Sequence, residues 1–436
     1  MNRIRLQFAL GLLFVATCSR GQQNVPPAVR GEMPPATSES GLKNVLTGGF
    51  SVTSSYDDNA LSTVDNHSSD TQFNIAPHVG IQQSRRHFNW SADYAPGFAF
   101  SRRFDNRDEL TQAVGGGFQF QPTARWSLWA RENFTVTTDP FQQLAQDAFL
   151  PDLAPSNAPN PSIVAPLAKR TGKVSSAGAS YRWSAHTSIG LNAGFSQLDY
   201  DNLSSDSTTP LLNSQSASGG LFISHQLSKT QTVGVQYSFA ELQFAQLGSS
   251  HTITHSVQLF DQFQFSPRSS LYFFVGPEYA RSAFNAQFLI AQQIIQFPLR
   301  SSSWSPAAGA IYTFRSQRGS LQISYTRRVS DGGGLGTAVH LDDVSGEFRR
   351  TLTPRWTAGI GAGYAINSVA NAAALDSGLN SISSFAELQR QLAKNLTLRF
   401  SYSLLRQDGS LLGQVQGDHN RAVISLEYHF ARPLGF

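Results

Sequence analysis

The stretch Ala422–Phe430, close to the end of the chain, alternates strictly between apolar and polar side chains. One set of alternate positions is apolar and ends in two aromatic residues, whereas the other set holds Ser425, Glu427 and His429. Side chains of a β-strand point alternately to its two faces, so the two sets lie on opposite faces. A chain built of many such strands must cover each apolar face with protein or with lipid.

The same two-residue period recurs from about residue 44 onward, which indicates β-strands rather than helices. The positions between the apolar residues carry Ser, Gln, Asn, Gly, Thr and scattered charges. An all-β fold with one apolar and one polar face per strand is therefore predicted. The clearest stretches are 73–81, 88–100, 126–136, 189–195, 233–239, 271–279, 304–314, 321–325, 356–366 and 396–404.

The gaps between these stretches alternate in length. Counting the segments between them predicts about 18 strands, with about 16 as the alternative, and an even number places both termini on the side of the short turns. Short turns on one side and long polar loops on the other are typical of a transmembrane β-barrel. The short turns are expected near 83–86, 121–124, 184–187, 227–230, 266–269, 315–319, 353–355 and 393–395, and the long gaps at 57–70, 138–173, 199–214, 280–303 and 367–381.

The first residues are typical of a secretory signal peptide, with two arginines followed by a short apolar run over residues 8–16. We predict a signal peptide at 1–21, a flexible periplasmic tail at 22–43 and a barrel at 44–436. An alternative cleavage would leave Cys18 as a lipidated N-terminus, although Thr17 before it favours ordinary cleavage. No uninterrupted apolar run long enough for a transmembrane helix follows the signal.

Composition excludes several classes of function. Residues 1–21 hold three arginines and no acidic residue, so their removal lowers the formal net charge from +4 to +1, which gives no indication of nucleic-acid binding. The single cysteine excludes a disulfide framework and a thiolate metal site. Glycine-rich stretches such as 332–336 lack the following helix of a phosphate-binding loop, and 332–336 is expected to be a flexible external hairpin. No catalytic residue, metal ligand or cofactor is predicted.

Three features carry a resemblance to known proteins: the alternating strands, the closing strand, and turns in which Pro or Ser precedes a basic and an aromatic residue, as at 353–356. The chain resembles Gram-negative outer-membrane β-barrel proteins, especially porin-like families. The resemblance covers residues 44 to 436. It implies contact with outer-membrane lipid, association as a homo-oligomer such as a trimer, and recognition of the closing strand by the barrel-insertion machinery. Pro433 interrupts the alternation, so the closing aromatic is either Phe430 or Phe436; the signal residues in that strand are Leu426, Tyr428, Phe430 and Phe436.

The polar faces carry charges of both signs in near balance. Such charges either pair with each other and brace the wall, or set a field across a constriction. Two positions break the pattern, because Glu132 and Asp261 fall on the apolar parity; a β-bulge is favoured over contact with a partner protomer. The predicted lumen-lining residues are Arg131, Arg182, Arg328, Arg349, Arg399, Asp93, Glu278, Asp343, Glu347, Glu387 and Glu427.

Two long gaps are candidates for a loop that narrows the lumen. The first is 138–173, which is proline-rich and contains Phe141, Phe149 and Leu150; the second is 280–303, which is unusually apolar and alternatively extends two strands above the membrane. The leading hypothesis is a passive channel for small hydrophilic solutes. The alternatives are an exporter or secretion-associated barrel that uses the tail 22–43, and a structural or surface-binding barrel with a plugged lumen.

One enzyme hypothesis was weighed against these. Outer-membrane phospholipases carry Ser and His two residues apart on the lipid face, and His186-Thr-Ser188 has that spacing. However, His186 begins at a predicted short turn and Ser188 has the parity opposite Ile189, so lipid hydrolysis is not favoured. We therefore expect a barrel that is not an enzyme.

Overall fold

The structure, a computed structural model, describes thirteen stretches of the chain. The predicted signal peptide, Cys18, the tail 22–43, Phe149, Leu150 and Phe436 lie outside these residues, and the hairpin residues 284–290 and 293–299 are described by their backbone alone. The described stretches are 44–60, 67–104, 109–139, 141, 160, 162–164, 168–202, 211–244, 250–290, 293–334, 336–370, 378–409 and 417–434.

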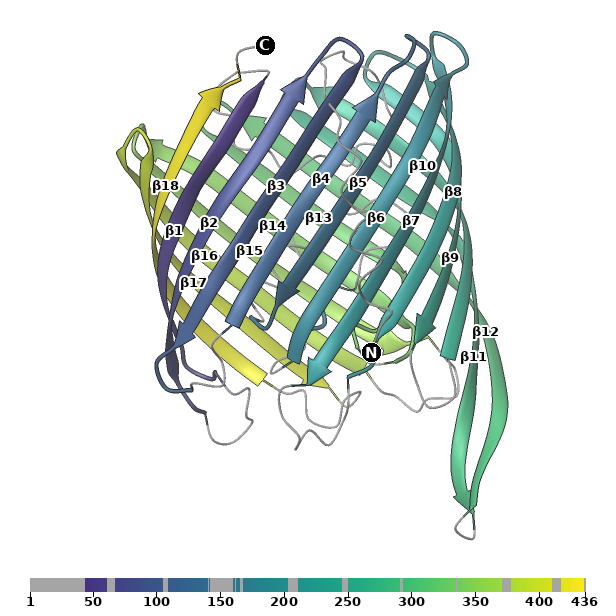
Figure 1. The fold of residues 1–436 in the computed structure, drawn as a ribbon. Helices are drawn as coiled ribbons and strands as arrows, with labels where there is room; N and C mark the ends of the chain where they lie inside the picture. Colours follow the sequence, from purple (N-terminus) through teal and green to yellow (C-terminus); the bar gives the residue numbers. More distant parts are fainter. Residues whose placement is uncertain are drawn as a thin grey trace, which may run out of the picture.

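Within the described residues the chain forms one antiparallel sheet of eighteen strands that closes on itself (Figure 1). This confirms the predicted fold and the larger of the two expected strand numbers. The strands are β1 (Val45–Asp57), β2 (Asp70–Ser84), β3 (Phe88–Ser101), β4 (Glu109–Phe120), β5 (Trp126–Thr137), β6 (Ala168–Arg182), β7 (Thr187–Asn202), β8 (Ser214–Gln226), β9 (Gln231–Phe244), β10 (Ser250–Ser266), β11 (Ser269–Ile290), β12 (Gln293–Ser316), β13 (Gly319–Ser330), β14 (Val339–Thr353), β15 (Trp356–Val369), β16 (Gly378–Ala393), β17 (Leu396–Gly409) and β18 (Gly417–Pro433).

The barrel closes where β1 pairs with β18, from Val45 opposite Pro433 to Asp57 opposite Arg421. The closing strand is therefore longer than the predicted Ala422–Phe430. Pro433 is the last residue of the strand and pairs with Val45, and Leu434 N beyond it still donates to Asn44 O over 3.0 Å. A proline at the end of a strand costs little stability. It lacks a backbone N–H, but at this position no hydrogen bond in the interior of the sheet requires one.

Each even-numbered strand up to β16 joins the next strand through one of the predicted short turns, so these turns and both ends of the barrel sheet lie at one end of the barrel, here called the turn end. The other connections lie at the opposite end, here called the loop end. The predicted long gaps are all shorter in the structure, 280–303 by the most. The gap 280–303 is almost entirely strand, and the hairpin of β11 and β12 extends well beyond the rest of the wall (Figure 1).

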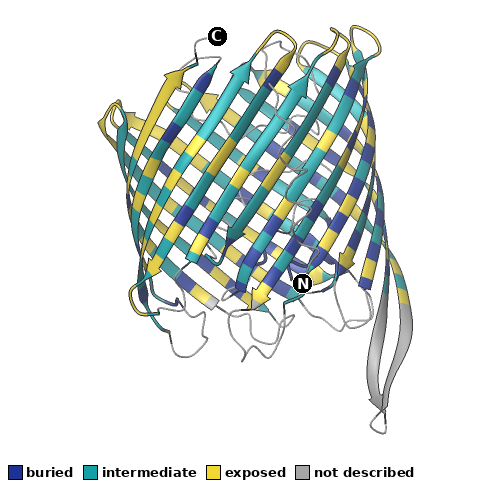
Figure 2. Ribbon diagram, viewed as in Figure 1, coloured by how far each residue is buried: buried dark blue, intermediate teal, exposed yellow. Residues whose placement is uncertain are grey.

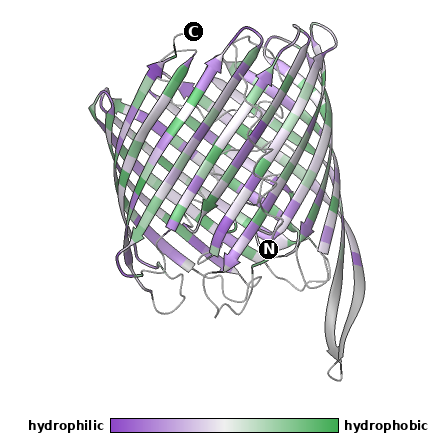
Figure 3. Cartoon of the chain, in the orientation of Figure 1, coloured by the Kyte–Doolittle hydropathy of each residue, from purple (hydrophilic) through white to green (hydrophobic). Residues whose placement is uncertain are grey.

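Burial follows the two-residue period around the ring (Figure 2). On β18 the outward residues Ile424, Leu426, Tyr428 and Phe430 are 37–44% exposed, whereas Ser425 between them is only 5% exposed. Hydrophobic and hydrophilic residues alternate along the strands in the same way (Figure 3). Large apolar side chains thus cover the outside of the barrel, and most inward side chains are polar. The exception is a buried inward cluster of Phe222, Phe260, Tyr272 and Phe274 on β8, β10 and β11. Among the described residues, no helix is long and apolar enough to cross a membrane.

The bulges expected at Glu132 and Asp261 are absent. The pairings of β5 with β4 and β6 keep one register through Glu132, and those of β10 with β9 and β11 keep one register through Asp261. Both carboxylates therefore face outward and are matched there by polar neighbours. Lys173 Nζ lies 3.5 Å from a Glu132 oxygen, and the Gln231 amide donates to Asp261 over 2.7 Å.

Candidate functional site

The connection between β5 and β6 reaches across the interior of the barrel. Asn160, near the end of this connection, donates through its side-chain amide to Asn367 on β15 over 2.7 Å. The strand β15 is nine positions from β6 in the ring of eighteen, which places it on the opposite side. Asn160 and Asn367 are 1% and 0% exposed. Of the two gaps expected to narrow the lumen, 138–173 is thus the one whose described residues enter it.

Asp331 lies directly after β13. It forms a buried polar group with Asn160, Ser162 and Asn367, and these four residues are here called the mouth cluster. The backbone N–H of Asn160 donates to Asp331 over 2.6 Å, and the hydroxyl of Ser214 on β8 donates to its other oxygen over 3.2 Å. Ser162 donates to the amide oxygen of Asn160 over 2.7 Å. Side chains from three separated parts of the wall therefore converge in the lumen near the loop end.

Burial raises the pKa of Asp331 above its ordinary value of 3.8, although hydrogen bonds from Asn160 and Ser214 and the positive charge of Arg170 act in the opposite direction. The desolvation of the carboxylate is the largest effect, because this side chain has lost its contact with water. The closed arrangement therefore favours the neutral form of Asp331 relative to an arrangement that exposes it to water.

The glycines after Asp331 are buried, so the expectation of a flexible external hairpin at 332–336 is wrong. Gly333 and Gly334 have φ angles of 54° and 103°, values that residues with a Cβ rarely adopt. A Cβ on Gly333 would lie 2.8 Å from Cβ of Ile163. The glycines thus allow this turn to fold inward and to pack against the segment after Asn160.

Two further contacts fix the ends of the crossing segment. Near its end, Val164 exchanges two hydrogen bonds with the side chain of Gln407 on β17, of 2.9 and 3.1 Å. Near its beginning, Asp139 forms an ion pair with Arg421 on β18, with oxygen–nitrogen distances of 2.5 and 2.6 Å. The guanidinium also lies over the ring of Phe141, 5.5 Å from its centroid.

Charged residues on the inner wall pair across intervening strands. Arg349 on β14 lies 2.9 Å from Glu387 on β16, and it also contacts Glu347. The residue between them on β15 is Gly359, where a Cβ would lie 2.8 Å from the Glu387 carboxylate. The glycine therefore leaves room for the two side chains to meet across one strand.

The row of inner-wall contacts continues on the next strands. Arg399 on β17 lies 3.3 Å from Glu427 on β18, and Glu427 in turn contacts His429 at 3.4 Å. His429 Nδ1 lies 3.3 Å from Nε2 of His78 on β2. Acidic, basic and imidazole groups thus alternate along the wall between β14 and β2.

The remaining predicted lumen residues all lie on the inward parity of their strands. Arg328 acts electrostatically on both Asp343 and Glu278, and Glu278 accepts a hydrogen bond of 2.9 Å from the backbone N–H of Val329. That these residues border a conducting path stays a prediction. The inward positions are Asp93 on β3, Arg131 on β5, Arg182 on β6, Glu278 on β11, Arg328 on β13 and Asp343 on β14.

The sequence analysis missed Asn160, Asp331, Asn367, Gln407 and Arg421. Four of them lie in or beside polar stretches that contain many similar residues, and only their partners distinguish them. Arg421 carried the clearest signal, because it is the charged residue directly before the apolar alternation of the closing strand. Pairing it with Asp139 requires the fold, since 282 positions separate them.

The enzyme hypothesis gains no support from the geometry. His186 lies in the turn between β6 and β7, and Ser188 pairs with Arg182 on the inward parity, so the two do not share the outer face. In the part of the chain that the structure describes, no three or more His, Cys, Asp or Glu side chains form a group suited to hold a metal ion.

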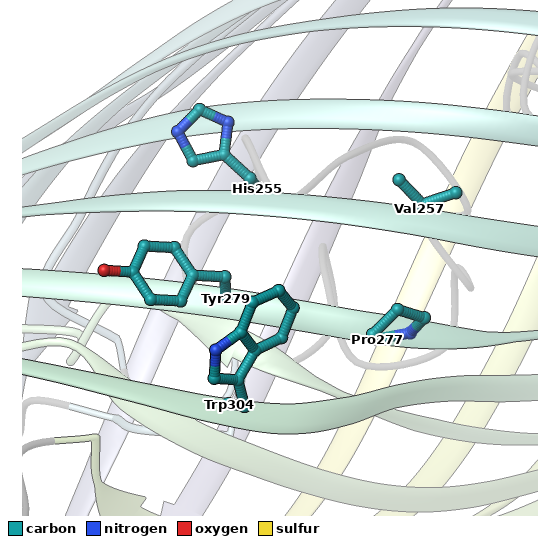
Figure 4. A pocket seen from close by; sticks show the side chains of 5 residues that line it. All are labelled: His255, Val257, Pro277, Tyr279 and Trp304. Atoms are coloured by element: carbon teal, nitrogen blue, oxygen red, sulfur yellow. The ribbon is translucent and has the colours of Figure 1, made fainter.

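A pocket of about 250 Å³ lies on the outer face (Figure 4). It is lined by His255 and Val257 on β10, Pro277 and Tyr279 on β11, and Trp304 on β12. Trp304 is 72% exposed, and the rings of Tyr279 and Trp304 are 5.1 Å apart. Aromatic side chains in this outward position are typical of the girdle where a barrel meets lipid headgroups.

No protein-family model and no curated protein matches this chain. Among solved structures, it is similar to OccK2 (OpdF) of Pseudomonas aeruginosa, with 11% identity, a TM-score of 0.42, and coverage of 88% of this chain and 98% of that chain. It is similar to OccAB4 of Acinetobacter baumannii, with 9% identity, a TM-score of 0.44, and coverage of 89% and 98%. The ferric-catecholate import receptor Fiu of E. coli K12 matches with 8% identity, a TM-score of 0.43, and coverage of 88% and 81%.

The class of the protein follows from its own geometry. The wall is a closed antiparallel ring, most of its large apolar side chains face outward, and most of its charged and amide side chains face inward. Short turns join the strands at the end that holds both ends of the sheet. These are the features of barrels that cross the outer membrane. The chain is a closed antiparallel β-barrel of eighteen strands with the architecture of a transmembrane barrel.

Proposed function

We propose that the barrel is a passive channel for small hydrophilic solutes, narrowed near the loop end by the segment that crosses from β5 to β15. The observation that carries the proposal is the combination of eighteen strands with a polar interior. Barrels of this strand number enclose an aqueous lumen that their own side chains do not fill. The crossing segment and the mouth cluster supply the narrow part, which limits the size of the solute.

The inner wall supports a weak preference between ions. Arg349, Glu387, Arg399 and Glu427 pair with one another, so much of their charge is neutralised locally. Exposed and partly exposed ion pairs still orient dipoles toward the lumen. A channel of this kind passes neutral polar solutes and ions of both signs, with size as the main criterion.

Reconstitution tests the proposal. Purified, folded barrel added to a planar bilayer should produce stepwise increases in conductance, and liposomes that contain it should admit small sugars faster than large ones. Heat-unfolded protein is the control. Absence of both conductance and sugar uptake in wild type would contradict the channel. If the Asn160→Ala variant alone conducted, the barrel would be one that the mouth cluster keeps closed.

The outer face supports contact with a second copy of the chain. Glu132 and Lys173 lie between apolar neighbours on β5 and small residues on β6, with side chains that are 50% and 47% exposed. A charge pair surrounded by lipid is unfavourable, whereas a protein interface provides partners for it. Because the register is intact, we propose that this face is the contact of a homo-oligomer such as a trimer.

Two further proposals concern assembly and export. We infer that the barrel-insertion machinery reads β18, whose outward aromatic Phe430 is 41% exposed and lies three residues before the end of the strand. The exporter alternative depends on the tail 22–43, which lies outside the described residues. Deletion of that tail without loss of folding or of conductance would leave the channel proposal intact and remove the basis for export.

A further inference from the structure

At the turn end of the barrel, two histidines from different strands meet over a glycine. His78 on β2 and His429 on β18 both face inward and are both paired with Gly49 on the strand between them. An added Cβ on Gly49 would lie 2.5 Å from Cε1 of His78, so only glycine leaves the space in which the rings approach. The ring centroids are 5.0 Å apart.

The distance between the facing nitrogens suits a shared metal ion. Nε2 of His78 and Nδ1 of His429 are 3.3 Å apart, a distance that a weak hydrogen bond or a bridging ion can span. Zinc binds imidazole nitrogen at about 2.0–2.1 Å in tetrahedral geometry, which places two such nitrogens about 3.3–3.4 Å apart. The two side chains therefore already have the separation that a tetrahedral ion between them requires.

Glu427 orients one of the two ligands. Its carboxylate lies 3.4 Å from the other ring nitrogen of His429, Nε2. A proton on Nε2 would be held toward this carboxylate, which leaves the lone pair of Nδ1 directed at His78. Arg399 contacts both oxygens of this carboxylate, at 3.3 and 3.4 Å, and keeps it in place. A carboxylate behind a metal-bound histidine is a common arrangement in metal sites.

We propose that His78 and His429 form a two-histidine binding site for a divalent transition-metal ion, with Zn²⁺ as the best fit, in the lumen near the turn end. Water fills the remaining coordination positions, because the described residues provide no third ligand in place. The side chain of His429 is 50% exposed, so an ion can reach the site from the lumen. Imidazole is a ligand that zinc prefers, whereas Ca²⁺ and Mg²⁺ prefer oxygen. The site does not depend on whether the barrel conducts.

Calorimetric titration with ZnCl₂ tests the proposal on the full barrel, folded in detergent and free of any polyhistidine tag. Wild type should bind one Zn²⁺ that His78→Gln and His429→Gln each weaken more than about 10-fold, while Glu427→Gln weakens it about 10-fold through the orientation of His429. His225→Gln is the matched control, because His225 lies at the same end of the barrel but contacts Thr187 instead. It should leave the affinity unchanged.

Co²⁺ gives a second readout, since its visible absorption reports coordination by imidazole in tetrahedral geometry. Wild type should show this absorption and the two histidine variants should lose it, with circular dichroism confirming that each variant is folded. Equal Zn²⁺ binding by wild type and by the His78→Gln/His429→Gln double variant would overturn the site. Absence of any Zn²⁺ binding by wild type would overturn it as well, and would identify the contact as a histidine–histidine hydrogen bond.

Discussion

Asn160 and Asn367 lie in parts of the barrel that are far apart along the chain, and an amide–amide hydrogen bond of 2.7 Å joins them inside the lumen. Asn160 also bonds to Asp331 and Ser162, so its side chain and backbone serve three partners that are themselves buried. Loss of Asn160 removes one hydrogen-bond partner from each of these buried groups. The crossing segment is therefore held by a group of bonds that fail together.

Asn160→Ala should release the crossing segment without unfolding the barrel. Each buried polar group left without a partner costs about 1–3 kcal/mol, which corresponds to about a 5- to 150-fold shift toward the released arrangement. Hydrogen exchange at the amide of Val164 measures the release, because that amide donates to Gln407 only when the segment is docked. The exposed Asn380 provides a control, since Asn380→Ala should leave the exchange of Val164 unchanged. Unchanged exchange in Asn160→Ala would contradict the role of the cluster.

The ion pair of Arg421 and Asp139 should contribute separately to docking. Arg421→Gln leaves a poorly solvated carboxylate on the segment, and removal of one member of a buried pair typically costs about 3–5 kcal/mol. Asp139→Asn/Arg421→Gln should cost less than the sum of the two single changes, because neither charge is then left alone. Single-channel conductance of all four proteins measures this, with the single variants expected to fluctuate most. Strictly additive effects would show that the two residues act independently.

The sequence predicted the wall well because its pattern is a local property of each strand. A period of two is visible in most strands, and Ile424, Leu426 and Phe430 face outward as their parity requires. The short turns were also predictable, since Pro, Ser and basic residues mark them. The extent of β18 was not, because the strict alternation covers only Ala422–Phe430, whereas backbone pairing continues to Pro433, where the end of a strand tolerates a proline.

The inside of the barrel could not be predicted in the same way. Asn160 bonds to residues 171 and 207 positions away, and no local pattern marks such partners. The glycines after Asp331 were predicted to form an external hairpin. Glycine is favoured both in flexible loops and where the backbone packs closely, so its presence alone does not distinguish the two. The bulge at Glu132 was expected on the assumption that lipid surrounds the whole outer face. The register is intact at Glu132, and its outward side chain forms an ion pair with Lys173.

The docked arrangement should depend on pH through Asp331. Burial raises the pKa of Asp331 above 3.8 when the cluster is closed, whereas an undocked and solvated carboxyl keeps its ordinary value. Protonation of Asp331 therefore stabilises the docked arrangement fully at a pH below the ordinary pKa. This stabilisation is lost as the pH rises through the raised pKa. Arg170 is the charged group that acts on Asp331, and its positive charge favours the ionised carboxylate.

Conductance measured from acidic to neutral pH tests this direction. Wild type should pass less current at acidic pH and more as Asp331 ionises. Asp331→Asn stays neutral at every pH and should show a flat profile at the level of the acidic wild type. A profile in Asp331→Asn that matches wild type would assign the pH dependence to another group.

Glu387→Gln should change the ion selectivity of the channel. The substitution removes one negative charge from the inner wall and leaves Arg349 with Glu347 as its remaining acidic partner. The local potential becomes more positive, so the reversal potential under a KCl gradient should shift toward chloride. Glu132→Gln removes a charge from the outer face and serves as the control, because lipid-side charges act weakly on the lumen. Equal shifts in the two variants would place Glu387 away from the conducting path.

The outward pair of Glu132 and Lys173 should determine the oligomeric state. If the pair lies in an interface between copies, Glu132→Lys places two positive charges side by side there and should dissociate the oligomer into monomers. Light scattering coupled to size-exclusion chromatography in detergent measures the mass, with the protein contribution separated from that of detergent. Asp261→Lys, which changes an outward carboxylate on β10, should leave the mass unchanged. If lipid rather than protein surrounds the pair, wild type is monomeric, and Glu132→Leu/Lys173→Leu should raise the thermal stability of the barrel, because two charges are removed from an apolar environment.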